Sequence, residues 1–134
     1  MKKIVCAVLL SITIFACRKD SVTIYNQELI GKWELTEYYI APGPPGEWHP
    51  ANDQTRHTAE FKTNGDFISN GYFYFGATAF TQVDSARIQF LNATQTQGDL
   101  VYFFELNNDN SMLTVSPLCI EGCSYRYKAV VPGE

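Results

Sequence analysis

The chain has 134 residues, of which 46% are hydrophobic, 14% aromatic and 18% charged, and its formal net charge is -4 at pH 7. This length predicts a single domain, and the composition excludes a disordered chain and a coiled coil. The sequence holds no cluster of Lys or Arg, so a nucleic-acid partner is not expected.

An export signal is predicted at the N-terminus. Lys2 and Lys3 precede an apolar run over residues 4–16, which is shorter than the roughly 20 residues that span a bilayer. This pattern is typical of a secretory signal peptide over residues 1–16. A buried helix is the alternative, but the run has no polar face.

The end of this signal, Ile14-Phe15-Ala16-Cys17, resembles the lipobox of bacterial lipoproteins. The resemblance implies that the Cys17 thiol receives a diacylglycerol, that cleavage follows Ala16, and that the new amine is acylated. Several acyl chains on one residue form a lasting anchor. We therefore expect residues 17–28 to be a lipidated tether that attaches the protein to the outer membrane, on either its periplasmic or its surface face.

Maturation makes the chain more acidic. Removal of residues 1–16 leaves 118 residues and a net charge of -6, because Lys2 and Lys3 are lost. Anionic headgroups repel such a body, so the lipid at Cys17 alone is expected to hold it at the membrane.

Two short motifs suggest further processing. Asp20-Ser21-Val22 and Asp84-Ser85-Ala86 resemble the O-glycosylation sequon of Bacteroidota, which makes Ser21 and Ser85 candidate glycosylation sites. Asp84-Ser85 is also typical of a turn.

The rest of the chain predicts β-structure. Asn26 is expected to cap one helical turn that ends at Gly31. Trp33, Leu35 and Tyr39 are expected on one face of the first strand, and residues 41–54 are expected to be a loop. Eight strands are predicted, at residues 32–40, 56–62, 66–72, 79–83, 87–91, 99–106, 112–117 and 125–129.

Two connections carry further signals. Asn64-Gly65 predicts a type I′ hairpin turn between the second and third strands. The run Tyr72-Phe73-Tyr74-Phe75 after the third strand is aromatic at every position and therefore fits no single face.

Two cysteines remain after maturation, because Cys6 leaves with the signal and Cys17 carries lipid. Outside the cytoplasm Cys119 and Cys123 are expected to form a disulfide across a hairpin in which Gly122 takes a positive φ. Such a small ring contributes about 2 kcal/mol. A redox pair, half of a metal site and free thiols are the alternatives.

Eight short strands joined mostly by tight turns favour an antiparallel up-and-down meander that closes into a barrel. A barrel of this size is filled by side chains or holds one small ligand. A two-sheet β-sandwich built from the same strands is the alternative.

Three segments resemble the lipocalin-like lipoproteins of Bacteroidota: residues 29–35 (LIGKWEL), 60–67 (EFKTNGDF) and 119–128 (CIEGCSYRYK). Gly31-Lys32-Trp33 is similar to the Gly-x-Trp signature of lipocalins. The resemblance covers about residues 29–130 and implies a barrel domain over residues 29–134. It also implies that Trp33 plugs the closed end against the N-terminal turn and that a cavity opens at the other end.

The resemblance further implies that aromatic side chains contact a ligand. Loop 41–54, with Trp48 and His49, takes the place of the lipocalin mouth loop and would act as a lid; a proline-stiffened surface loop is the alternative. The rings could equally fill the barrel as solid core. The candidate ligand-binding residues are Trp33, Tyr39, Trp48, Phe61, Tyr102, Phe104, Tyr125 and Tyr127.

No catalytic apparatus is recognised in the sequence. His49 and His57 lie in no catalytic motif, and the motifs of nucleophile elbows, phosphate loops, zinc sites and calcium loops are missing. We therefore expect no enzymatic activity, no cofactor and no metal. The favoured function is a lipid-anchored binding protein for a small apolar or amphipathic ligand. The alternative is a non-catalytic accessory module of an envelope complex, with a solid barrel and a protein partner.

Overall fold

The computed structural model describes residues 22–41, 43, 45–52, 55–71, 74–94, 100–119 and 122–133. The expectations for the signal peptide, Cys17 and Ser21 lie outside these residues. The described residues form one 3-10 turn, η1 (Gln27–Leu29), and nine strands. The strands are β1 (Gly31–Ile40), β2 (Glu47–Pro50), β3 (Thr58–Phe61), β4 (Phe67–Ser69), β5 (Ala79–Gln82), β6 (Arg87–Leu91), β7 (Leu100–Leu106), β8 (Met112–Pro117) and β9 (Cys123–Ala129).

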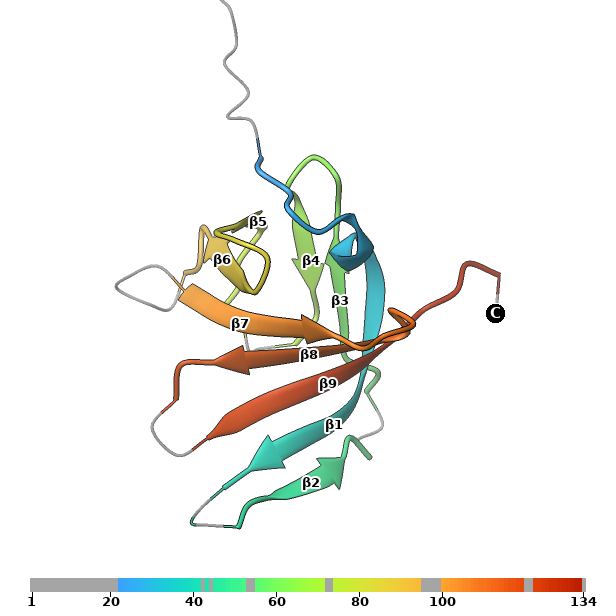
Figure 1. Cartoon of the computed structure of the whole chain (residues 1–134), viewed down its shortest axis with the longest axis vertical. Coiled ribbons are helices and arrows are strands. Elements are labelled where there is room, and N and C mark those ends of the chain that lie inside the picture. The colour runs from blue at the N-terminus through green and yellow to red at the C-terminus, as the bar shows by residue number, and fades with distance from the viewer. Residues whose placement is uncertain are drawn as a thin grey trace, which may run out of the picture.

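The strands form one antiparallel sheet that curls into a nearly closed barrel (Figure 1). Eight of them follow the order β4-β3-β1-β9-β8-β7-β6-β5, and β2 pairs with β1 beside this path. A single bridge between Asp66 and Ala79 joins the two edges. The longest register joins β1 to β9, from Trp33 opposite Ala129 to Ile40 opposite Cys123. The predicted eight-stranded meander barrel is confirmed, and β2 is added to it.

The connections gather at two ends of the barrel because neighbouring strands run in opposite directions. The closed end holds η1 and the β3–β4, β5–β6 and β7–β8 turns. Asn26 caps η1, as expected, by accepting a hydrogen bond from the amide of Glu28. Trp33 is 2% exposed, and its Nε1 donates to the carbonyl oxygen of Leu29 over 3.0 Å, so the indole plugs this end. The open end holds the β1–β2 hairpin, the segment after β4 and the β8–β9 loop.

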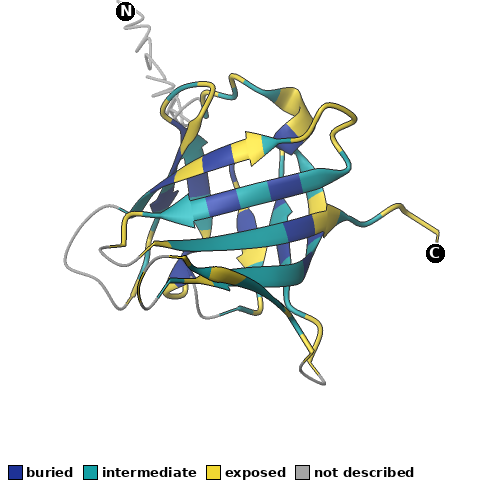
Figure 2. Cartoon of the chain, turned by 60° about the horizontal axis from the view of Figure 1, so that its bottom comes forward, coloured by how far each residue is buried: buried dark blue, intermediate teal, exposed yellow. Residues whose placement is uncertain are grey.

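Side chains fill the closed half of the barrel. The ring of Phe61 lies 5.0 Å from the rings of both Phe67 and Phe80, and Phe67 lies 4.8 Å from Phe90. Tilted and edge-on ring pairs of this kind stabilise a core beyond the area they bury. Buried positions recur along the strands and face the interior (Figure 2). The core comprises Leu29, Trp33, Leu35, Ala59, Phe61, Phe67, Tyr74, Ala77, Phe80, Ile88, Phe90, Tyr102, Phe104, Leu113, Val115 and Tyr127.

Tyr74 enters this core from outside any strand. Its ring lies 4.7 Å from the ring of Phe90 and 4.8 Å from that of Phe67, and only 1% of the residue is exposed. The next residue, Phe75, has a φ of +50° and is 37% exposed. Within the described part of the aromatic run, Tyr74 is therefore buried and Phe75 exposed, which the sequence pattern alone did not resolve.

Two predicted connections are wrong in detail. The segment 41–54 is not a continuous loop, because Glu47–Pro50 form β2 and pair with the second half of β1. The β3–β4 turn is not type I′, because Gly65 has a φ of +86° and Asn64 does not have a positive φ. It is a hairpin loop that ends in a left-handed glycine. β4 is also shorter than the predicted strand 66–72.

A bulge in β1 decides which tyrosine faces the interior. The register with β9 shifts between Leu35 and Glu37, and beyond the shift Tyr38 lies opposite Tyr125. One extra residue moves every later side chain to the other face of a strand. The prediction that Tyr39 shares the inner face of Trp33 is therefore wrong.

Candidate functional site

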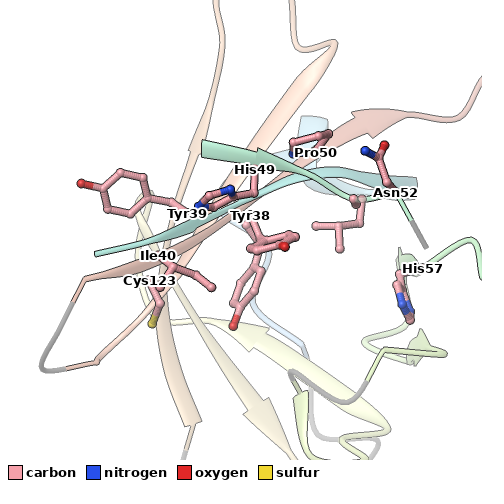
Figure 3. Close-up of a pocket in the computed structure, with 11 residues that line it drawn as sticks. Tyr38, Tyr39, Ile40, His49, Pro50, Asn52, His57 and Cys123 are labelled. Carbon is pink, nitrogen blue, oxygen red and sulfur yellow. The ribbon is translucent and has the colours of Figure 1, made fainter. Parts of the chain in front are cut away.

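A cavity of about 710 Å³ lies in the open half of the barrel, between β1, β2, β9 and the segment before β3 (Figure 3). We call it the first lobe. Its volume falls in the range of about 300–1,000 Å³ that small-molecule sites usually have. Its lining residues are Leu35, Tyr38, Tyr39, Ile40, His49, Pro50, Ala51, Asn52, His57, Cys123 and Tyr125.

A second cavity of about 400 Å³ adjoins the first, and we call it the second lobe. Cys123 and Tyr125 of β9 line both lobes, so this strand forms their common wall. The second lobe is lined by Phe75, Leu100, Val101, Tyr102, Pro117, Leu118, Cys119, Cys123 and Tyr125.

The two lobes differ in chemistry. In the first lobe Tyr38 and His49 stack, with ring centroids 5.5 Å apart and planes at 29°. Within the described part of the chain, the side chains of Tyr38, His49 and Asn52 make no hydrogen bond. Phenol, imidazole and amide groups both donate and accept hydrogen bonds, so this lobe offers several polar contacts.

The second lobe is mainly apolar. It is lined by aliphatic and aromatic side chains and by the disulfide. Its phenol groups are those of Tyr102 and Tyr125. Among the described residues that line the two lobes, none is Asp, Glu, Lys or Arg. The described lining would therefore present a bound molecule with hydrogen-bonding groups in the first lobe and with apolar surface in the second.

Buried tyrosines lie between the lobes and the closed core. The hydroxyl of Tyr74 donates to the hydroxyl of Tyr127 over 2.8 Å, and the rings of Tyr74 and Tyr102 are 5.9 Å apart. Burial raises the pKa of Tyr102 to about 12, and burial also raises the pKa values of Tyr74 and Tyr127 above the ordinary value. These phenols are therefore neutral hydrogen-bonding groups at physiological pH.

The candidate ligand-binding residues divide into three groups. Tyr102 and Tyr125 line the second lobe, and Tyr125 and Tyr39 line the first. The other members of the predicted set lie outside both lobes. Of these, Trp33, Phe61, Phe104 and Tyr127 are buried in the core, and Trp48 lies on β2.

Trp48 and Tyr39 belong to a cluster on the outer face of the sheet. The Arg126 guanidinium carbon lies 3.9 Å from the centre of the Trp48 ring, and Arg126 also pairs with Glu37. The ring of Tyr39 lies 5.4 Å from that of Trp48 and packs over Gly46, where an added Cβ would approach its hydroxyl to 2.5 Å. Cation–π and ring contacts of this kind hold β2 against β1 and β9. We assign Trp48 a structural position, and Tyr39 borders the first lobe from outside (Figure 3).

Several lining residues were not in the predicted set: Leu35, Tyr38, Ile40, His49, Asn52, His57, Phe75 and Leu118. Tyr38 was missed because the bulge is invisible in the alternation pattern. His49 was missed as an inward residue because β2 has only four residues and contains Pro50. His57 lines the first lobe from the segment before β3.

The open rim carries the expected disulfide. Cys119 and Cys123 are bonded, with Cα atoms 6.1 Å apart, and Gly122 has the predicted positive φ of +69°. Beside it, Leu118 is 74% exposed, and Ile40, the cross-strand neighbour of Cys123, is 49% exposed. The described part of the rim thus exposes at least two apolar side chains.

Other candidate features lie away from the lobes. Ser85 is exposed in the β5–β6 turn of the closed end, where Asp84 accepts a hydrogen bond from the amide of Ala86, so the predicted turn is confirmed. In the residues described here, no group of three or more His, Cys, Asp or Glu side chains is placed to hold a metal ion. No helix among those residues is long and apolar enough to cross a membrane.

No family model, curated protein or solved structure matches this chain. The likeness to lipocalins therefore stands on the barrel itself, which is consistent with that fold in its strand order, its N-terminal turn and its buried Trp33.

Proposed function

We propose that this protein is a membrane-anchored, lipocalin-like lipoprotein that binds a small amphipathic molecule at the open end of its barrel. The observation that supports the proposal is the pair of adjoining lobes above a solid aromatic base. The role is one of binding, without catalysis or a cofactor.

The difference between the lobes indicates how such a molecule would lie. Its polar group would hydrogen-bond with Tyr38, His49 and Asn52 in the first lobe. Its apolar part would cross Tyr125 and rest against Leu100 in the second lobe. Burial of apolar ligand surface supplies affinity, and the polar contacts fix the orientation.

Binding of a neutral fluorescent amphiphile, N-phenyl-1-naphthylamine, tests the site. Ala51 lines the first lobe, so Ala51→Trp should fill it and weaken probe binding by tenfold or more, which corresponds to about 1.4 kcal/mol. Ala86→Trp is the matched control, because Ala86 is exposed at the closed end. Equal binding by the two variants would place the probe elsewhere and refute the site.

Native mass spectrometry of the protein purified from its own host addresses the ligand directly. A bound small molecule that is lost in Ala51→Trp and kept in Ala86→Trp would support the proposal. A ligand-free protein that also fails to bind the probe would contradict it.

A second function, as a non-catalytic accessory module, is favoured by the exposed apolar side chains at the open end. Leu118 and Phe75 expose side chains that a protein partner could cover. Crosslinking in intact cells from a photoreactive residue at position 118 should then recover one defined protein. Recovery of none, together with probe binding in the lobes, would decide for the small-molecule role.

A further inference from the structure

The buried side chain of Gln82 holds the N-terminal segment against the barrel through hydrogen bonds, and we call this set of contacts the clasp. Gln82, at the end of β5, is 2% exposed. Its Oε1 accepts from the amides of Tyr25 and Asn26 over 2.9 and 2.7 Å, and its Nε2 donates to the carbonyl oxygen of Asn26 over 2.9 Å. The backbone N–H of Gln82 also donates to the carbonyl oxygen of Thr23. All hydrogen-bonding atoms of this side chain amide thus engage the strap over residues 23–26.

The strap continues along the closed end as far as the described chain extends. Val22 packs on the β3–β4 turn, where a Cβ on Gly65 would lie 2.2 Å from Cγ2 of Val22. In Figure 1 this blue segment lies beside the top of β4, at the end of the barrel that carries η1. Val22, the first described residue, therefore lies at the closed end, opposite the two lobes.

The length of chain before Val22 sets how far the barrel stands from an anchor. Four residues separate Cys17 from Val22 in the sequence, and the five Cα-to-Cα steps between them span about 18 Å when the chain is fully extended. β1 runs from the closed end to the open end over ten residues. At about 3.3 Å per residue and a tilt of about 40°, the barrel wall is about 23 Å high. With the open end against the bilayer, Val22 would stand higher above the membrane than its tether reaches.

We propose that the closed end of the barrel faces the membrane and that the open end with its two lobes faces the aqueous phase. The inference rests on the proposed lipid at Cys17. Tyr25 and Val83, which lie beside the clasp, are 60% and 37% exposed. Exposed aromatic and apolar side chains suit an end that faces the membrane, because such groups are favoured at the membrane–water interface.

This orientation specifies the source of the ligand. In this orientation the rim, where Ile40, Phe75 and Leu118 are exposed, points away from the anchoring bilayer. The ligand is therefore exchanged with donors and acceptors in the aqueous phase, rather than by direct contact of the rim with the membrane that holds the protein.

Energy transfer from the barrel to the membrane tests the orientation. The lipidated full-length protein is placed in vesicles of phosphatidylethanolamine and phosphatidylglycerol that carry an acceptor dye on their headgroups. A donor dye is attached to an unnatural amino acid at Val83, at the closed end, or at Leu118, at the rim. Transfer from position 83 should exceed that from position 118 by about twofold or more, because the two labels differ in height by about 23 Å. Equal transfer, or stronger transfer from position 118, would overturn the inference.

Release of the clasp supplies a second test. Gln82→Ala frees the strap up to Asn26, which lengthens the reach to about 32 Å and permits the open end to approach the bilayer. The difference between the two labels should shrink in this variant and persist in Gln89→Ala, the control, which changes a half-buried glutamine on β6. Circular dichroism establishes that each variant is folded. An unchanged difference in a folded Gln82→Ala protein would show that the tether does not set the orientation.

The mass of the N-terminal peptide separates this inference from the proposed function. An unmodified Cys17 with no vesicle attachment would refute the anchor, and the orientation would fall with it. A lipidated Cys17 with the rim near the bilayer would refute the orientation alone. Probe binding in the lobes reports on ligand recognition in either case.

Discussion

The buried phenol pair of Tyr74 and Tyr127 offers a quantitative test of the barrel interior. Each residue is 1% exposed, and the hydroxyl of Tyr74 donates to that of Tyr127 over 2.8 Å. A buried hydrogen bond contributes about 0.5–1.5 kcal/mol net, whereas a buried polar group left without its partner costs about 1–3 kcal/mol. Tyr74→Phe and Tyr127→Phe should therefore each lower the free energy of unfolding by about 1–2 kcal/mol.

The double variant distinguishes a true pair from two independent groups. Removal of both hydroxyls leaves no buried hydroxyl without a partner. The free energy of unfolding of the double variant should therefore be little lower than that of one single variant, with a coupling energy of about 1 kcal/mol. Urea unfolding at pH 7, with the disulfide intact, measures all three proteins. Tyr38→Phe is the control, since its phenol makes no hydrogen bond within the described residues, and it should change stability by less than about 0.5 kcal/mol. Losses that simply add in the double variant would show that the two phenols do not depend on each other.

Three further expectations concern the turns and the titration of the core. Replacement of both Cys119 and Cys123 by Ser should lower the free energy of unfolding by about 2 kcal/mol, measured by urea titration, because the five-residue ring restrains the unfolded chain only weakly. Gly65→Ala should destabilise by about 1–3 kcal/mol, because its φ is +86° and its new Cβ would meet Val22; adding Val22→Ala should restore part of that loss. Tyr102, whose pKa burial raises to about 12, keeps its proton in the folded protein while the unfolded chain loses it above pH 10. Stability should therefore fall as the pH rises from 10 to 12, and Tyr102→Phe should flatten this fall in unfolding measured across that range.

Periodicity predicted most of the fold because most strands have one face in the core. Trp33 and Leu35 alternate with polar residues, and both lie inside the barrel as expected. The departures arise where local geometry breaks the period of two. The β1 bulge places Tyr38 on the inner face, where the alternation pattern predicted Tyr39. No residue type marks this bulge in the sequence.

The site was less predictable than the fold because core and lining residues share one composition. Phe61 and Tyr125 both follow the inward period, yet the first fills the base and the second divides the lobes. The height of a residue along the barrel separates these roles, and that height depends on registers between distant strands. Tyr74 illustrates the same limit, since it reaches the core from a turn after β4.

The pairing of β1 with β9 bears on when the barrel can form. This register joins strands about 90 residues apart, so the sheet is completed only after nearly the whole chain is available. Contacts of such long range delay folding, because the chain must lose the entropy of closing a large loop before the contacts between its ends can form. A chain with this topology stays without its central strand pair until its last hairpin has been made. Because β9 is the last strand to be made, the barrel cannot be completed while the chain is still being synthesised.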